Sequence, residues 1–192
     1  RHLGASSAQL SQNHGLWRGQ LQGQHFAGYV EYRPADERHP SGLVFARLNY
    51  LYLPKSEQYE ELAPVSQAED APEPVQGQTQ WPALDIHVHD FQVADKAMGQ
   101  LALLARQRQD EHGAHYWALE RFQILNAQGR WRAQGRWFAP ALGQQRLQSR
   151  HTELQFTLEI SDAGALLGRV GMPGVVAGGQ GLLSGQLMWR GS

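Results

Sequence analysis

One stretch of the sequence places three potential metal ligands, Asp85, His87 and His89, at every second position. Residues two apart on a β-strand project from the same face, so a carboxylate and two imidazoles would lie side by side, a donor set that suits Zn²⁺, Fe²⁺ or Cu²⁺. The intervening Ile86 and Val88 make the opposite face the dry one, and no third histidine follows at a spacing typical of a metal site. We therefore expect a solvated polar face without a metal ion, and whether this face binds another ligand stays open.

A second polar set consists of Arg130, Arg132 and Arg136, which share one side of another alternating stretch. Guanidinium groups in a row could bind phosphate, but the preferred interpretation is that they keep the outer face of a sheet soluble and hinder pairing with other chains. On the other side of this stretch, Trp131 and Trp137 alternate with glycine and alanine. The small residues leave notches for a flexible apolar chain, or else the tryptophans pack against a helix as ordinary core.

The sequence contains no recognisable catalytic motif. Ser184 lies near Gly181 and Gly185, but the spacing is not that of the nucleophile elbow of hydrolases, and the serine falls in a strand. No glycine-rich phosphate loop is followed by a lysine. We therefore expect a protein that is not an enzyme and needs no cofactor. A metal-dependent enzyme is kept as a hypothesis, ranked below the two that are described at the end of this section.

The composition narrows the class of protein. With 41% hydrophobic and 18% charged residues the chain has the make-up of a folded protein, and its formal net charge of -1 gives no reason to expect a nucleic acid as partner. The absence of cysteine excludes disulfides and thiolate metal sites. Charge is uneven, because residues 54–82 hold six acids against one lysine whereas residues 121–150 hold six arginines and no acid.

The elements that position these side chains are strands, because apolar residues recur with a period of two in several stretches. The clearest are residues 84–88, 129–137, 154–160 and 183–189. Short polar turns between consecutive strands favour antiparallel pairing, since parallel strands need long crossovers. The pattern predicts a mainly β fold, an antiparallel meander with one apolar face.

Turn residues and composition predict how the chain is divided. We expect strands in residues 3–32 around an Asn13-His14-Gly15 turn, at 42–53, and at 84–93, 98–106, 116–125 and 129–138. In the strand at 42–53, Leu48, Tyr50 and Tyr52 should share one face. Residues 54–82 contain five prolines and no periodicity, which indicates a linker or long loop. The expected organisation is an N-terminal β segment at 1–53, the acidic linker at 54–82 and a C-terminal β segment at 83–192.

One short helix is expected near residues 162–170. Asp162 is a typical N-cap, and Gly171 followed by Pro173 is a typical stop signal. Leu166, Leu167 and Val170 lie at helical spacing and should face the sheet. The helix could plug or cap the apolar face.

A series of short motifs runs along the second half of the chain in a fixed order. They are Trp81-Pro82-Ala83-Leu84-Asp85, Gly99 with Leu101 and Leu103, Trp117-Ala118-Leu119-Glu120, Gly135-Arg136-Trp137, residues 162–171 (DAGALLGRVG), 178–181 (GGQG) and 185–189 (GQLMW). In this order they resemble the C-terminal region of the YhdP branch of AsmA-like proteins. The first 53 residues match more loosely, at 28–32 and 51–54.

This resemblance implies a large protein that an N-terminal helix anchors in the inner membrane of Gram-negative bacteria. Such proteins are similar to the TamB proteins and the bridge-like lipid transfer proteins, and they cross the periplasm as a long curled β-sheet whose apolar groove carries phospholipid towards the outer membrane. The chain would then be a periplasmic segment near the C-terminal end. Its expected partners are phospholipid acyl chains, the remainder of its own longer chain and outer-membrane components, but no nucleic acid.

The alternating pattern itself indicates which side chains would line such a groove, since they share the dry face of the predicted strands. They are Leu84, Ile86, Val88, Leu101, Leu103, Trp131, Trp137, Leu154, Phe156, Leu158, Ile160, Leu187 and Trp189. The competing hypothesis is a non-catalytic scaffold or interaction module of the cell envelope, in which the chain's own helix and loops fill that face. An open groove would favour the lipid carrier, and a closed core would favour the scaffold.

Overall fold

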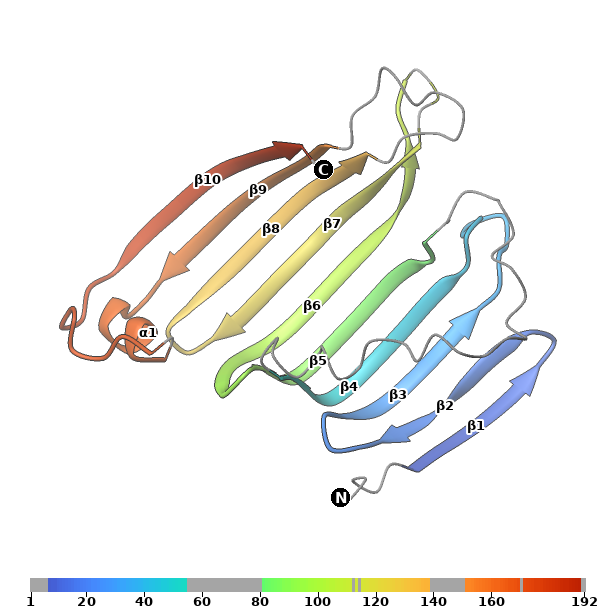
Figure 1. The fold of residues 1–192 in the computed structure, drawn as a ribbon, viewed down its shortest axis with the longest axis horizontal. Coiled ribbons are helices and arrows are strands. Elements are labelled where there is room, and N and C mark those ends of the chain that lie inside the picture. The colour runs from blue at the N-terminus through green and yellow to red at the C-terminus, as the bar shows by residue number, and fades with distance from the viewer. Residues whose placement is uncertain are drawn as a thin grey trace, which may run out of the picture.

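The computed structural model describes residues 7–54, 81–111, 113, 115–138, 151–169 and 171–190, and in these ranges the chain forms ten strands and one short helix (Figure 1). The strands are β1 (Ser7–Asn13), β2 (Leu16–Gln22), β3 (Phe26–Arg33), β4 (Leu43–Leu53), β5 (Ala83–Val93), β6 (Lys96–Gln109), β7 (His115–Asn126), β8 (Gly129–Phe138), β9 (His151–Ile160) and β10 (Gly181–Arg190). The helix α1 spans Ala163–Arg169. The prediction of a mainly β fold with a short helix is confirmed.

The strands form one sheet in which spatial order follows chain order from β1 to β10 (Figure 1). The sheet is open, with β1 and β10 at opposite edges. All neighbouring strands are antiparallel except β4 and β5, which pair in parallel from Leu43 opposite Ala83 to Leu53 opposite Val93. The meander prediction therefore holds for every pair but this one. Two parallel neighbours cannot be joined by a short turn, and the sequence places residues 54–82 between β4 and β5.

Cross-strand register divides the sheet into two chemically different faces, because directly opposed residues project to the same side. One row of opposed residues crosses from β1 to β10 through Leu10, Gly19, Val30, Ala46, Ile86, Leu103, Phe122, Ala133, Phe156 and Gly185. A second row contains Leu21, Gly28, Leu48, Val88, Leu101, Ile124, Trp131, Leu158 and Leu183. We call the side formed by these rows the apolar face and the opposite side the polar face.

The most buried part of the apolar face lies at the centre of the sheet. Val88 is 2% exposed, Ile124 4%, and Phe91 and Leu101 7% each; they form one cluster. Partly buried residues pack against it, namely Leu48, Leu51, Leu53, Ile86, Met98 and Phe122. Within the described residues, the main contacts of each strand are with its neighbours in the sheet, so no second layer covers this face.

Two matched irregularities change which side chains reach the apolar face. Ala27 pairs with Tyr50 but Gly28 pairs with Leu48, so β4 bulges there, and β5 is irregular between Val88 and Phe91. A bulge inserts a residue and reverses the alternation beyond it. Leu51 and Leu53 therefore join the cluster on the apolar face, and the prediction that Tyr50 and Tyr52 share the face of Leu48 is wrong.

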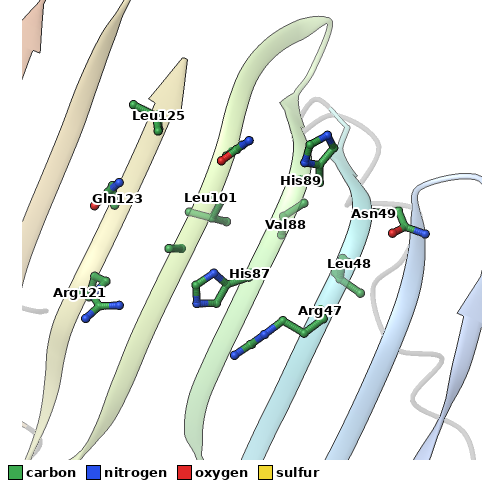
Figure 2. Close-up of a pocket in the computed structure, with 12 residues that line it drawn as sticks. Arg47, Leu48, Asn49, His87, Val88, His89, Leu101, Arg121, Gln123 and Leu125 are labelled. Carbon is green, nitrogen blue, oxygen red and sulfur yellow. The ribbon is translucent and has the colours of Figure 1, made fainter. Parts of the chain in front are cut away.

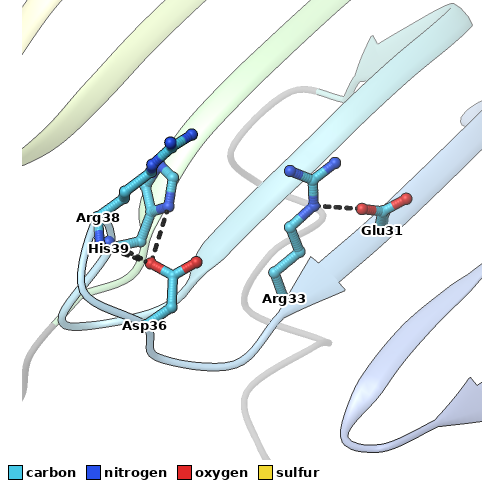
Figure 3. Close-up of polar contacts among 5 residues, drawn as sticks. All are labelled: Glu31, Arg33, Asp36, Arg38 and His39. Carbon is cyan, nitrogen blue, oxygen red and sulfur yellow. Dashed lines mark hydrogen bonds and ion pairs between the residues drawn. The ribbon is translucent and has the colours of Figure 1, made fainter.

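The β3–β4 connection is held by its own side chains (Figure 3). Asp36 Oδ1 accepts hydrogen bonds from the backbone nitrogens of Arg38 and His39, at 2.9 and 2.6 Å, and lies 3.3 Å from His39 Nδ1. The hydrogen bond from the His39 amide is the main cause that lowers the pKa of Asp36. Before this turn, Glu31 pairs with Arg33. These local contacts fix the entry into β4.

The predicted turn at Asn13-His14-Gly15 is present between β1 and β2, with His14 at φ 47° and Gly15 at φ 80°. Two consecutive left-handed residues match the right-handed twist of a tight hairpin. The φ values of His14 and Gly15 thus fit the predicted turn.

The helix forms where Asp162 and Gly171 predict it. Ala165 N donates to Asp162 Oδ1 at 2.9 Å, which is the expected N-cap, and Gly171 adopts φ 97° after the last turn. Arg169 donates to Ala97 O at 2.7 Å and to Gln128 Oε1 at 2.5 Å. The helix thus lies at the end of the sheet where the β5–β6 and β7–β8 hairpins turn (Figure 1).

Some predictions concern residues outside the described ranges. The acidic linker falls almost wholly on 55–80, and Val170 of the predicted helix is likewise not described. Among the described residues, no helix has the length and apolar character needed to cross a lipid bilayer.

Candidate functional site

The apolar face brings together all the side chains that the alternating pattern assigned to a groove. Val88, Leu101, Trp131 and Leu158 lie in one row, and Ile86, Leu103 and Phe156 lie in the other. A third row runs through Trp17, Tyr32, Val44, Leu84, Ala105, Leu119, Gly135, Leu154 and Leu187. Trp137 and Trp189 are both opposite Thr152 at one end, and Ile160 lies opposite Gly129 and Gly181 at the other.

Exposure along this face rises from the centre towards both edges. Val88 and Leu101 are buried, whereas Trp137 is 56% exposed, Leu187 50% and Trp189 47%. Towards β1, Leu10 is 58% and Trp17 45% exposed. Large apolar side chains in water are unfavourable unless another apolar body covers them. The flanks of the face are therefore available for a ligand or a partner.

Aromatic rings line the flank formed by β7 and β8. Trp131 packs edge to face on Phe122 with ring centroids 5.4 Å apart, and Trp137 does so on Trp117 at 6.3 Å. Between the two tryptophans of β8 lie the small residues Ala133 and Gly135. The large rings thus alternate with positions that have little or no side chain, so the surface of this face is uneven.

Several apolar-face residues are not part of the predicted set. Phe122 and Ile124 alternate with Arg121 and Gln123, so the period of two was available to identify them. Phe91 follows the irregularity in β5 and is out of phase with Leu84, Ile86 and Val88. No sequence periodicity could have assigned it to this face.

The arginines of the polar face are paired with acids on neighbouring strands. Arg132 and Arg130 both contact Glu159, the latter at 3.8 Å, and Arg136 lies 3.1 Å from Glu153. These cross-strand ion pairs make Arg130, Arg132 and Arg136 part of a solvated, ion-paired surface. The structure therefore favours the solubilising role over phosphate binding for these three.

Glu120 forms a similar pair on the polar face with Arg106 and Arg108, each at 2.5 Å. Burial alone would raise the pKa of Glu120, but hydrogen bonds from Arg108 and Arg106 outweigh it and lower the pKa. The carboxylate is thus held in its charged form.

The carboxylate of the candidate metal set is paired with an arginine. Asp85 Oδ1 lies 2.9 Å from Arg47 Nη1 and 3.8 Å from His87 Nε2, so its main partner is a cation. Among the described residues, no group of three potential metal ligands comes together. Burial lowers the pKa of His87, and Arg47 and Arg121 lower it further against the opposing effect of Asp85.

His87 and His89 instead line a shallow hollow of about 460 Å³ on the polar face, which we call the polar-face depression (Figure 2). Its side chains come from four adjacent strands, β4 to β7. The polar and charged ones are Arg47, Asn49, His87, His89, Gln100, Arg121 and Gln123. Sequence reasoning found the two histidines but neither Arg47 nor Arg121 as their neighbours.

A model of one protein family, described as YhdP protein, matches residues 3–192 of this chain. A search of curated proteins and a search of solved structures each gave no significant match.

Proposed function

The chain belongs to the YhdP family, and from that premise and the geometry of its apolar face we propose that this segment carries phospholipid acyl chains along the sheet. The proposed setting is the periplasm, within an inner-membrane-anchored protein that moves phospholipid towards the outer membrane. The role requires no catalysis and no cofactor, because the lipid is moved and not altered.

The observation that carries the proposal is the uncovered apolar face. Three rows of opposed residues run across the sheet without a break from β2 to β10, and no described element covers them. Acyl chains lack polar groups, so they can slide over such a surface without losing hydrogen bonds. Each methylene that leaves water contributes about 0.8 kcal/mol, so even part of one acyl chain supplies substantial binding free energy.

The two faces suit this role in different ways. Headgroups can stay in water at the border of the apolar face, since only the tails need cover. The opposite face keeps the sheet soluble through ion pairs such as Arg136 with Glu153. A one-layer sheet with these two faces presents a continuous path for tails and does not need a closed cavity.

The test is mass spectrometry of lipids extracted from the purified protein. The wild type is compared with Phe156→Asp, which places a carboxylate on the apolar face of β9, and with Thr157→Asp, which places the same carboxylate one residue further on the polar face, opposite Arg132 and Ser184. We expect stoichiometric phospholipid in the wild type and in Thr157→Asp, and little in Phe156→Asp. Leu187→Asp should behave like Phe156→Asp, and Arg132→Ala like the wild type.

Circular dichroism of each variant establishes that the sheet is retained before lipid is measured. A folded Phe156→Asp protein with the full lipid content of the wild type would refute an acyl-chain path on this face. Absence of lipid from the wild type as well would favour the scaffold hypothesis, in which the apolar flanks dock a partner of the cell envelope.

A further inference from the structure

The polar-face depression is a hollow because a small residue lies between larger ones. In the register of β4 to β7, Arg47, His87, Ala102 and Gln123 are opposed in one row. Ala102 contributes only a methyl group, so the surface sinks between His87 and Gln123. Figure 2 shows His87 between Arg47 and Arg121, with Gln123 further along β7.

The lining of this hollow is rich in cations and hydrogen-bond donors. It contains two arginines and two histidines but no acid. Asp85, whose Oδ1 lies 3.8 Å from His87 Nε2, is already engaged with Arg47 Nη1. Because charges are only partly screened in a hollow, two arginines against one carboxylate give the site a positive potential.

Arg121 differs from the polar-face arginines of the two neighbouring strands, β6 and β8. Arg106, Arg108, Arg130, Arg132 and Arg136 each contact an acid, whereas no described residue forms an ion pair with Arg121. The contacts of Arg47 with Ala46 O, Asp85 O and Asp85 Oδ1 all use Nη1. Guanidinium donors thus remain available on two sides of His87.

We propose that the polar-face depression is a binding site for a phosphate group. Arg121 and Arg47 would be its charged hydrogen-bond donors, and Gln123 and His87 would donate further hydrogen bonds. Arginine presents planar pairs of N–H donors that match phosphate oxygens, and such charge-assisted hydrogen bonds are stronger than neutral ones. A cation is a poor ligand here, since the two guanidinium groups would repel it. The site is separate from the proposed acyl-chain path, because it lies on the opposite face of the sheet.

The phosphate group could belong to a small molecule in solution or to the headgroup of a lipid in a membrane surface. The chemistry of recognition is the same in both cases, since only the phosphate oxygens enter the hollow. The two sources are separated by the probe: inorganic phosphate reports the first, and vesicles of phosphatidylcholine with or without phosphatidylglycerol report the second.

The experiment is equilibrium dialysis of the full chain against radiolabelled inorganic phosphate. The variant is Arg121→Gln, and the matched control is Arg18→Gln, which removes an arginine from the same row of opposed residues on β2, outside the depression. We expect saturable binding at one site in the wild type. Loss of one charge-assisted hydrogen bond should weaken it about tenfold or more in Arg121→Gln and leave Arg18→Gln unchanged.

Vesicle flotation with the same three proteins gives the second arm. Flotation with phosphatidylglycerol vesicles that Arg121→Gln reduces and Arg18→Gln does not would assign the headgroup as source, and phosphate binding without such flotation would assign a soluble ligand. The proposal is overturned if the wild type binds neither probe, or if both variants weaken binding equally. Lipid carried on the apolar face is measured independently, so failure of one proposal does not decide the other.

Discussion

Phe156 and Gly185 are opposed across the β9–β10 ladder, and the ring of Phe156 fills the space that a side chain at Gly185 would need. A Cβ placed on Gly185 would lie 2.8 Å from two carbons of that ring. The glycine therefore determines where the Phe156 ring lies on the apolar face.

We expect Gly185→Val to displace the Phe156 ring and to lower the free energy of unfolding by about 1 kcal/mol, because overpacking forces a side chain out of its preferred position. Urea denaturation measures this change. Ser184→Val introduces the same residue one position earlier, on the polar face, and should change stability by less than about 0.5 kcal/mol. Equal effects of the two variants would show that the ring moves without cost.

The central cluster predicts that alanine substitution of two valines on the same strand, β5, lowers the free energy of unfolding by different amounts. Val88 is 2% exposed and Val93 is 38% exposed. Val88→Ala should lower the free energy of unfolding by about 2 kcal/mol, since it removes two buried methyl groups and leaves a cavity. Val93→Ala should cost less than about 0.5 kcal/mol. A small effect at both positions, measured by urea denaturation, would mean that the centre of the sheet is not a packed core.

The environment of His87 predicts a loss of stability at mildly acidic pH. Burial, together with Arg47 and Arg121, lowers its pKa below the ordinary value of 6.5, so the folded chain binds this proton less readily than the unfolded chain. Stability is then fully present above pH 6.5 and falls as the pH drops through 6.5 towards the lower folded pKa.

His87→Gln should therefore reduce the difference in unfolding free energy between pH 7.5 and pH 5.5, measured in a buffer free of phosphate. The value at pH 7.5 serves as the control, because His87 is neutral there in both states. An unchanged difference between the two pH values would show that His87 is not desolvated.

The N-cap of α1 predicts that substitution of Asp162 changes the stability of the first turn of this helix. Asp162→Ala removes the acceptor of the Ala165 amide and should destabilise the first turn by about 1 kcal/mol, whereas Asp162→Asn retains an acceptor. Hydrogen exchange of the Ala165 amide measures this directly, with exchange about fivefold faster expected in the alanine variant alone. Equal rates in all three proteins would mean that the cap does not hold this helix.

Strand positions and the two faces of most strands were predictable because they depend on local geometry. Successive side chains of a strand point to opposite sides, so the alternation in 129–137 or 154–160 is enough to predict which residues share a face. The helix was predictable for the same reason, since Asp162 and Gly171 act on backbone groups only a few residues away.

What the tertiary structure alone decided is how strands pair. The parallel alignment of β4 with β5, the bulges that bring Leu51 and Phe91 to the apolar face, and the meeting of Arg47 and Arg121 beside His87 all depend on register between distant segments. Arg47 and His87 are 40 positions apart, yet the β4–β5 ladder makes them direct neighbours. A period of two assigns each strand its faces, but only hydrogen bonding between strands determines which residues of those faces meet.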